Sequence, residues 1–276
     1  MKNIQTIFIS LLLFISSRLI IAQEVDDQRE FDYDQGSSKG PDQWGNLREE
    51  WATCRDGVMQ SPIDLSNEIV DIVPHLGELK MKYKPSNATL RNRGHDIMLQ
   101  WTGYAGSIEI SGTNYKLVQS HWHTPSEHAI DGKRFDLEQH MVHQSTDPIF
   151  GTRIAVIGIL YNIGRPEPFL SKLEKHIKSI SGGPNEITVG MIDPRHIRIS
   201  EDSYYRYMGS LTTPPCSESV TWTIDTRVRS VSTQQVELLK AAVHDYASNN
   251  ARPLQPLNDR EIFLYQLGGP WNYQDI

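Results

Sequence analysis

The sequence has few cysteines, no run of basic residues and no long apolar stretch beyond its first 22 residues. The two cysteines, Cys54 and Cys216, stand far apart and form no CxxC motif, so the paired thiols of a redox or zinc-ribbon motif are absent. Lysine and arginine number 27 against 34 acidic residues, which gives a formal net charge of −7. An acidic chain without a basic run does not suit nucleic acid or an anionic membrane as a partner.

The one apolar stretch lies at the amino terminus. Residues 1–22 combine an early Lys2 with a short apolar core, a pattern that predicts a secretory signal peptide cleaved after Ala22. An uncleaved anchor is the alternative, although the core is short for a membrane span. In an oxidising compartment we expect the two cysteines to pair and Asn87, in the sequon NAT, to accept a glycan. The predicted location is the secretory pathway, extracellular or apoplastic, with a secretory route to plastids left open.

The rest of the chain predicts one mainly β domain of the α+β class. Residues 23–30 are polar and predict a flexible arm. From about residue 88, short alternating or β-branched runs are separated by turn residues, which indicates a sheet-dominated fold. Two segments, 167–180 and 232–247, have helical periodicity, and the second opens with a capping box of Ser232 and Gln235. Because no repeat or linker divides the chain, a single domain is expected.

Five of the ten histidines lie within residues 117–144. Side chains alternate between the two faces of a strand, so His121 and His123 share a face in "QSHWH", and His140 shares one with Glu138 in "EQHMVH". If the two strands are close in the sheet, three imidazoles converge. Three neutral imidazoles with an open fourth position are the ligand set of a catalytic zinc site.

The same alternation supplies partners for the ligands. Gln119 and Glu138 each lie two residues before a histidine on the same face, where they can accept the free ring N–H and fix its tautomer. His128 and His143 are predicted to point away and to be structural. Two alternatives compete with this zinc site: hydrogen-bonded core histidines, and a cupin metal site, because "HWHTPSE" fits H-x-H-x-x-x-E. The glycines that a cupin needs around this motif are misplaced.

Several motifs together resemble the α-class carbonic anhydrases, in particular the secreted plant members. The similarity covers nearly the whole mature chain, and the motifs that carry it are "MQSPIDL" at 59–65, "NRGHD" at 92–96, "QSHWHTPSEH" at 119–128, "DLEQHMVH" at 136–143, "YMGSLTTPPCSESVTWTI" at 207–224 and "RPLQPLNDR" at 252–260. The resemblance implies a domain over 31–268 followed by a tail, 269–276. Its expected fold is a twisted, mostly antiparallel central sheet with surface helices and zinc at the base of a conical cavity.

The resemblance also assigns roles to residues. The zinc ligands fall on His121, His123 and His140, the same three that the alternation selects. The catalytic set implied by the family is Glu127, the hydroxyl of Thr212 that it orients, and a proton-shuttle histidine at His95, which would otherwise be read as an exposed loop residue. The remaining implied positions are Thr213 beside bicarbonate, the CO2 pocket of Val142, Val156, Leu211, Val220 and Trp222, the carbonyl of Asn250 behind His123, and Tyr33 at the cavity mouth.

The expected function is therefore reversible hydration of carbon dioxide to bicarbonate and a proton by zinc-bound hydroxide. The cofactor is Zn²⁺, the substrate is a small molecule, and the oligomeric state is left open. A carbonic-anhydrase-like storage or binding protein with little activity is the alternative. Survival of all three histidines together with Glu127 and Thr212 favours the enzyme.

Overall fold

The structure is a computed structural model that describes residues 30–147, 151–181, 185–244 and 247–267. The predicted signal peptide, nearly all of the predicted arm and the predicted tail lie outside these residues. Within the described residues, no helix has the length and apolar character needed to cross a membrane.

Strands make up most of the described chain. They are β1 (Asp64–Leu65), β2 (Val70–Ile72), β3 (Lys80–Tyr83), β4 (Ser86–Asn92), β5 (Ile97–Trp101), β6 (Gly106–Ile110), β7 (Thr113–His123), β8 (Ala129–Ile130), β9 (Lys133–Arg134), β10 (Leu137–Asp147), β11 (Gly151–Ile163), β12 (Glu186–Ile192), β13 (Ser203–Ser210), β14 (Glu218–Asp225), β15 (Arg229–Val231) and β16 (Ile262–Gln266).

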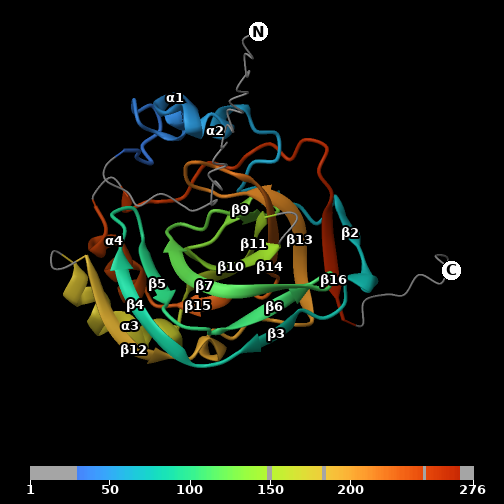
Figure 1. Ribbon diagram of the computed structural model, residues 1–276. Coiled ribbons are helices and arrows are strands. Elements are labelled where there is room, and N and C mark those ends of the chain that lie inside the picture. Colours follow the sequence, from blue (N-terminus) through green and yellow to red (C-terminus); the bar gives the residue numbers. More distant parts are fainter. Residues whose placement is uncertain (1–29, 148–150, 182–184, 245–246, 268–276) are drawn as a thin grey trace, which may run out of the picture.

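The helices are few and mostly short. They are α1 (Trp44–Leu47), α2 (Thr53–Asp56), α3 (Pro168–Ile180) and α4 (Thr233–Ala242), with 3₁₀ turns at Pro41–Gln43, Glu49–Trp51, Pro74–Leu76 and Pro194–His196. Figure 1 shows α1 and α2 at one end of the molecule, and α3 and α4 together on one flank of the sheet.

One twisted sheet of 13 strands organises the molecule, with the order β12-β4-β5-β7-β10-β11-β14-β13-β16-β2 along its main path. Most pairs are antiparallel, and β11 with β14 is one of the few parallel pairs. The long strands β7, β10 and β11 lie at its centre (Figure 1). A second sheet has only β1, β8 and β9. The prediction of one mainly β domain with a mostly antiparallel sheet is confirmed.

Both predicted helices are present, and the second is shorter than predicted. The capping box of Ser232 and Gln235 forms in full at the start of α4. The helix ends at Ala242, because Val243 is extended and the N–H of His244 donates to the carbonyl of Gly94. That contact pulls the chain away from the helix axis and toward the turn between β4 and β5.

Two apolar cores lie on the two faces of the central strands. The larger one packs α3 and α4 against residues such as Leu99, Trp122 and Met141. The other contains Val142, Val156 and Trp222 on the opposite face. Because successive residues of β10 alternate between the two cores, the even-numbered residues from Glu138 to Val142 face away from the helices.

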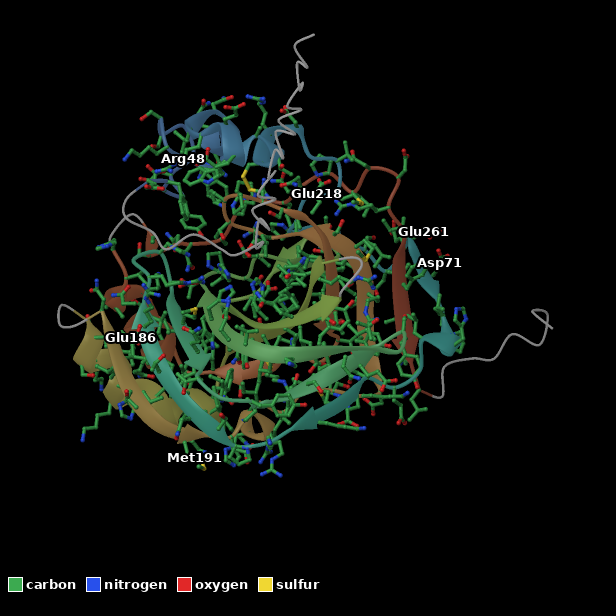
Figure 2. The ribbon with its side chains drawn as sticks, viewed as in Figure 1. Arg48, Asp71, Glu186, Met191, Glu218 and Glu261 are labelled. Carbon is green, nitrogen blue, oxygen red and sulfur yellow. A yellow bond between two sulfur atoms is a disulfide. The ribbon has the colours of Figure 1, made fainter. Side chains whose placement is uncertain are left out.

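The disulfide expected between Cys54 and Cys216 is present, and the described residues contain no free cysteine. It joins α2 to the loop after β13, two segments separated by 162 residues in sequence. Figure 2 shows it beneath the two short helices α1 and α2, while charged side chains such as Arg48, Asp71 and Glu186 lie on the outside.

We expect the double substitution Cys54→Ser/Cys216→Ser to lower the free energy of unfolding by about 2–4 kcal/mol, because the bond restricts the unfolded chain over a long loop. Urea unfolding followed by tryptophan fluorescence measures this change. Reductant should lower the wild-type midpoint to that of the double variant and leave the variant itself unaffected. Equal midpoints for the oxidised wild type and the variant would contradict the prediction.

Candidate metal centre

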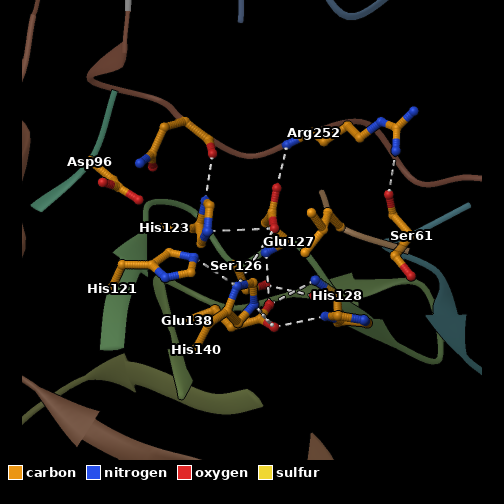
Figure 3. A network of polar contacts seen from close by, with 12 residues as sticks. Ser61, Asp96, His121, His123, Ser126, Glu127, His128, Glu138, His140 and Arg252 are labelled. Atoms are coloured by element: carbon orange, nitrogen blue, oxygen red, sulfur yellow. Dashed lines mark hydrogen bonds and ion pairs between the residues drawn. The ribbon is translucent and has the colours of Figure 1, made fainter. Parts of the chain in front are cut away.

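Two adjacent strands bring the three predicted histidines together. β7 and β10 are antiparallel neighbours, with His121 directly opposite His140 and His123 opposite Glu138. The ring centroids of the three imidazoles lie 4.6 to 5.1 Å apart. One ring nitrogen from each lies within 4.8 Å of the others, in a group that could hold a metal ion, and all three residues are buried. Figure 3 shows the rings turned toward one another.

The other nitrogen of each ring contacts an oxygen. Nδ1 of His121 lies 2.9 Å from Oε1 of Gln119, and Nε2 of His140 lies 2.7 Å from Oε1 of Glu138. Nδ1 of His123 lies 2.8 Å from the carbonyl oxygen of Asn250. Because an oxygen acceptor takes the ring N–H, the remaining nitrogen of each imidazole carries the electron pair that can bind a metal. Two of these nitrogens, Nδ1 of His140 and Nε2 of His121, lie 3.3 Å apart. The alternation of side chains along β7 and β10 predicts the first two of these contacts.

Asn250 anchors the loop after α4 to the site. Its side-chain nitrogen donates to the carbonyls of His95 and Trp122, and its side-chain oxygen accepts the N–H of Thr124. These three bonds fix the residue whose own carbonyl orients His123.

Buried polar atoms in the centre fit a cation. Nε2 of His123 and Oε2 of Glu127 are buried, and neither has a hydrogen-bond partner among the residues that the structure describes. Burial alone would lower the pKa of His123, but the charge of Glu127 and the Asn250 carbonyl outweigh it and raise that pKa. The surroundings therefore favour positive charge at this nitrogen, and a metal dication would supply it.

Glu138 is the most heavily bonded carboxylate in the site. It accepts the backbone N–H groups of Glu127 and His128 as well as contacts from the rings of His128 and His140, at 2.7 to 2.8 Å. Burial raises the pKa of Glu138, yet the charge interactions and hydrogen bonds with His128 and His140 outweigh burial and hold that pKa well below the usual range. Gly158 on the neighbouring strand β11 leaves room for this carboxylate, since a Cβ at that position would lie 3.0 Å from Oε1 of Glu138.

Glu127 is held so that one oxygen is used and the other is free. Oε1 accepts the backbone N–H of Arg252 at 2.9 Å, and Oε2 lies 3.6 Å from Nε2 of His123 (Figure 3). Thr212 and Thr213 are buried in the loop after β13, where the N–H of Cys216 donates to the carbonyl of Thr213. The disulfide thus braces the loop that carries both hydroxyls.

An apolar wall adjoins the histidines. The five predicted pocket residues belong to one buried cluster on the same side of the sheet: Val142, Val156, Leu211, Val220 and Trp222. The rings of His140 and Trp222 have centroids 4.8 Å apart. The wall therefore begins next to a histidine of the centre.

His95 lies in the turn between β4 and β5 and is fully buried, so the alternative of an exposed loop residue is wrong. Its ring packs 5.2 Å from that of Phe31, and Nε2 lies 3.7 Å from Oδ2 of Asp96. The same turn carries a buried ion pair between Arg93 and Asp96. Burial raises the pKa of Asp96, but the charges of Arg93 and His95 outweigh it and hold that pKa below its usual range.

Tyr33 is 7% exposed and packs edge-on against Trp44, in the aromatic cluster that also contains Phe31. This places Tyr33 on the same side of the molecule as the turn that carries His95. Its assignment to a cavity mouth stays a prediction.

Sequence reasoning missed residues that support the centre from loops. His128, predicted to point away and to be structural, links Glu138 to the hydroxyl of Tyr207, 2.7 and 2.6 Å away, without its contact to Glu138 having been predicted. The guanidinium of Arg252 is buried and donates to the carbonyls of Ser61 and Cys54. Strand alternation carries no signal for either residue, because their contacts depend on how loops fold over the sheet.

His143 does turn to the opposite face, as predicted. Its Nε2 lies 2.8 Å from the hydroxyl of Tyr83, and burial lowers its pKa to about 4. It is therefore neutral near pH 7 and stands outside the metal centre.

The fold and this donor set define a class: a mainly β protein with a buried three-histidine group that could hold a metal. Residues 39–266 match the family model of the eukaryotic-type carbonic anhydrases, and the chain belongs to that family. Membership excludes the cupin alternative.

Relatives and solved structures agree with this membership. Alpha carbonic anhydrase 7 of Arabidopsis thaliana is 53% identical over 91% of this chain and 90% of its own length. A crystal structure of dioscorin complexed with ascorbate has a TM-score of 0.84 at 46% identity, and covers 87% of this chain and 99% of that one. The α-carbonic anhydrase of Thermovibrio ammonificans, solved with the inhibitor sulfanilamide, has a TM-score of 0.74 at 34% identity, covering 84% and 98%.

Proposed function

We propose that the protein is a zinc enzyme that hydrates carbon dioxide reversibly to bicarbonate and a proton. The observation that carries the proposal is the trio His121, His123 and His140, each with one ring nitrogen on an oxygen acceptor, in a group whose ligand atoms lie within 4.8 Å of one another. Zinc held by three neutral imidazoles lowers the pKa of the water it binds to about 7, a value that carbonic anhydrases themselves exemplify, and so supplies a nucleophile at neutral pH.

Glu127 and Thr212 orient that nucleophile. An ionised carboxylate can only accept hydrogen bonds, and Oε1 of Glu127 already accepts from Arg252. In the working site Oε2, which has no hydrogen-bond partner among the described residues, would accept a hydrogen bond from the Thr212 hydroxyl. The threonine oxygen could then only accept a hydrogen bond from the attacking group. The direction of these hydrogen bonds is thus set by the backbone N–H of Arg252, which donates to Glu127. Thr213, the neighbouring hydroxyl, contacts the bicarbonate product.

The apolar wall of Val142, Val156, Leu211, Val220 and Trp222 receives carbon dioxide. The substrate has no net charge and few polar handles, so an apolar surface binds it without first having to release tightly held water. Trp222 lies against His140, which sets the substrate beside the metal and excludes bulk water from that side.

A storage or binding role is the second candidate. The likeness to dioscorin favours it, since dioscorin, at 46% identity, was solved in complex with ascorbate. The deciding experiment is zinc content and CO2 hydration rate of the purified chain without residues 1–22. One zinc per chain with rapid hydration supports the enzyme, and a metal-free, inactive chain supports storage. An aryl sulfonamide should inhibit only the enzyme.

The disulfide and the plant relatives suggest a secretory route, and we propose cleavage after Ala22 and an extracellular or apoplastic location. Asn87 is exposed on β4 and is the proposed glycan acceptor.

His95 is the proposed proton shuttle, because each hydration cycle releases a proton and an imidazole titrates near 6.5 in water. We expect His95→Ala to lower kcat about tenfold or more in dilute buffer, with kcat/KM nearly unchanged because attack on carbon dioxide does not involve the shuttle. Stopped-flow hydration at several buffer concentrations measures both constants.

Added imidazole should restore much of the lost turnover in His95→Ala. The matched control is His196→Ala, which removes an exposed histidine and should change neither constant. Undiminished turnover of His95→Ala in dilute buffer would show that another group carries the proton.

A further inference from the structure

A chain of polar side chains crosses the apolar core directly behind the metal centre. The hydroxyl of Tyr161 donates to Oε1 of Gln139 at 2.8 Å, and Nε2 of Gln139 donates to Oγ of Ser120 at 2.9 Å. The Ser120 hydroxyl donates in turn to the backbone carbonyl of His140 at 2.8 Å. We call these three side chains, Tyr161, Gln139 and Ser120, the polar chain.

The polar chain is enclosed by apolar residues. Gln139 is 1% exposed, Ser120 0% and Tyr161 2%. Gln139 and Ser120 face the larger core, which contains Tyr161 itself together with Trp122 and Met141. Burying polar groups costs free energy unless each finds a partner. Here the donors run in one direction, so Gln139 and Ser120 each accept one bond and donate one.

The polar chain also spans the strands that carry the ligands. Tyr161 lies on β11, Gln139 on β10 and Ser120 on β7, and these three strands are neighbours. Ser120 directly precedes His121, Gln139 directly precedes His140, and the last acceptor is the carbonyl of His140 itself. Burial raises the pKa of Tyr161 well above its usual value, so its hydroxyl stays protonated and remains a donor.

We propose that Tyr161, Gln139 and Ser120 are positioning residues that hold the backbone of His140 against β7 and thereby keep the three-histidine site preorganised for its metal. This inference rests on the proposed zinc function. A bond from Ser120 to the His140 carbonyl limits how far β10 can shift along β7 at the point where His121 and His140 face each other. An apolar core would fill the same space without fixing that point.

The test replaces the whole polar chain with apolar groups of similar shape, in the triple variant Tyr161→Phe/Gln139→Leu/Ser120→Ala. Removing all three side chains at once strands no side-chain donor or acceptor, and only the His140 carbonyl loses a bond, so the metal-free protein should keep most of its urea midpoint. We expect its zinc dissociation constant, measured by chelator competition at fixed pH, to rise about tenfold, the lower end for groups that support metal ligands indirectly. The single variant Ser120→Ala should give most of this loss.

Met141→Leu is the matched control, since Met141 lies on the same face of β10 and is equally buried. It should leave the zinc dissociation constant unchanged. A triple variant that binds zinc as tightly as Met141→Leu would overturn the inference, as would a loss of stability that is the same with and without zinc. A wild-type chain that binds no zinc would instead refute the proposed function, so the two failures are told apart.

Discussion

His140→Ala is expected to abolish zinc binding and to reduce CO2 hydration to the background rate. His140 is one of only three protein ligands proposed for the metal, and its ring lies between Glu138 and the centre. Its removal also leaves Oε1 of Glu138 with one ring contact in place of two. Metal analysis after dialysis and stopped-flow hydration measure the two losses, and His121→Ala and His123→Ala should behave alike.

His75→Ala is the control for this set, because it removes an exposed histidine far from the centre in sequence. It should keep one zinc per chain and full activity. Circular dichroism shows whether each ligand variant is folded, so loss of zinc is not confused with unfolding. A folded His140→Ala variant that hydrates carbon dioxide at the wild-type rate would disprove the assignment of the site.

The geometry of the metal centre follows from sequence to the extent that it lies on regular strands. The alternation of side chains grouped His121 with His123 and Glu138 with His140, and the pairing of β7 with β10 supplied the proximity that alternation alone could not. The contact between Gln119 and His121 was predictable for the same reason. Once β7 and β10 are known to be neighbours in this register, the alternation of side chains along each strand is enough to place the three histidines together.

Residues on loops and short strands escaped prediction. The contact of Glu127 with the backbone of Arg252 joins residues 125 apart in sequence, and no periodicity encodes it. The strands β1 and β2 are only two and three residues long, too short to alternate recognisably. The polar chain escaped too, because Ser120 and Gln139 face the core away from the histidines, where a sequence pattern predicts only burial.

Glu127→Gln is expected to lower kcat/KM for CO2 hydration at least about 100-fold, the order lost when a preorganised hydrogen-bonding group leaves an active site, while zinc stays bound. The reason lies in polarity. The N–H of Arg252 requires an acceptor at the Oε1 position, so the glutamine oxygen must take that place and its NH2 must take the place of Oε2. The NH2 then donates to the oxygen of Thr212. The threonine hydroxyl must in turn donate to the attacking oxygen, and this hydrogen bond occupies a lone pair that would otherwise attack carbon dioxide.

Thr212 provides the matched comparison, because the two residues are proposed to act as a unit. Thr212→Ser keeps the hydroxyl and should keep most activity, whereas Thr212→Val removes it and should cost about as much as Glu127→Gln. Groups that act together are strongly non-additive, so the double variant Glu127→Gln/Thr212→Val should be no slower than the slower single variant. Stopped-flow kinetics on zinc-loaded protein measures all four variants. Losses that multiply in the double variant would mean that Glu127 and Thr212 act separately, and the proposed relay from Arg252 through Glu127 to Thr212 would have to be abandoned.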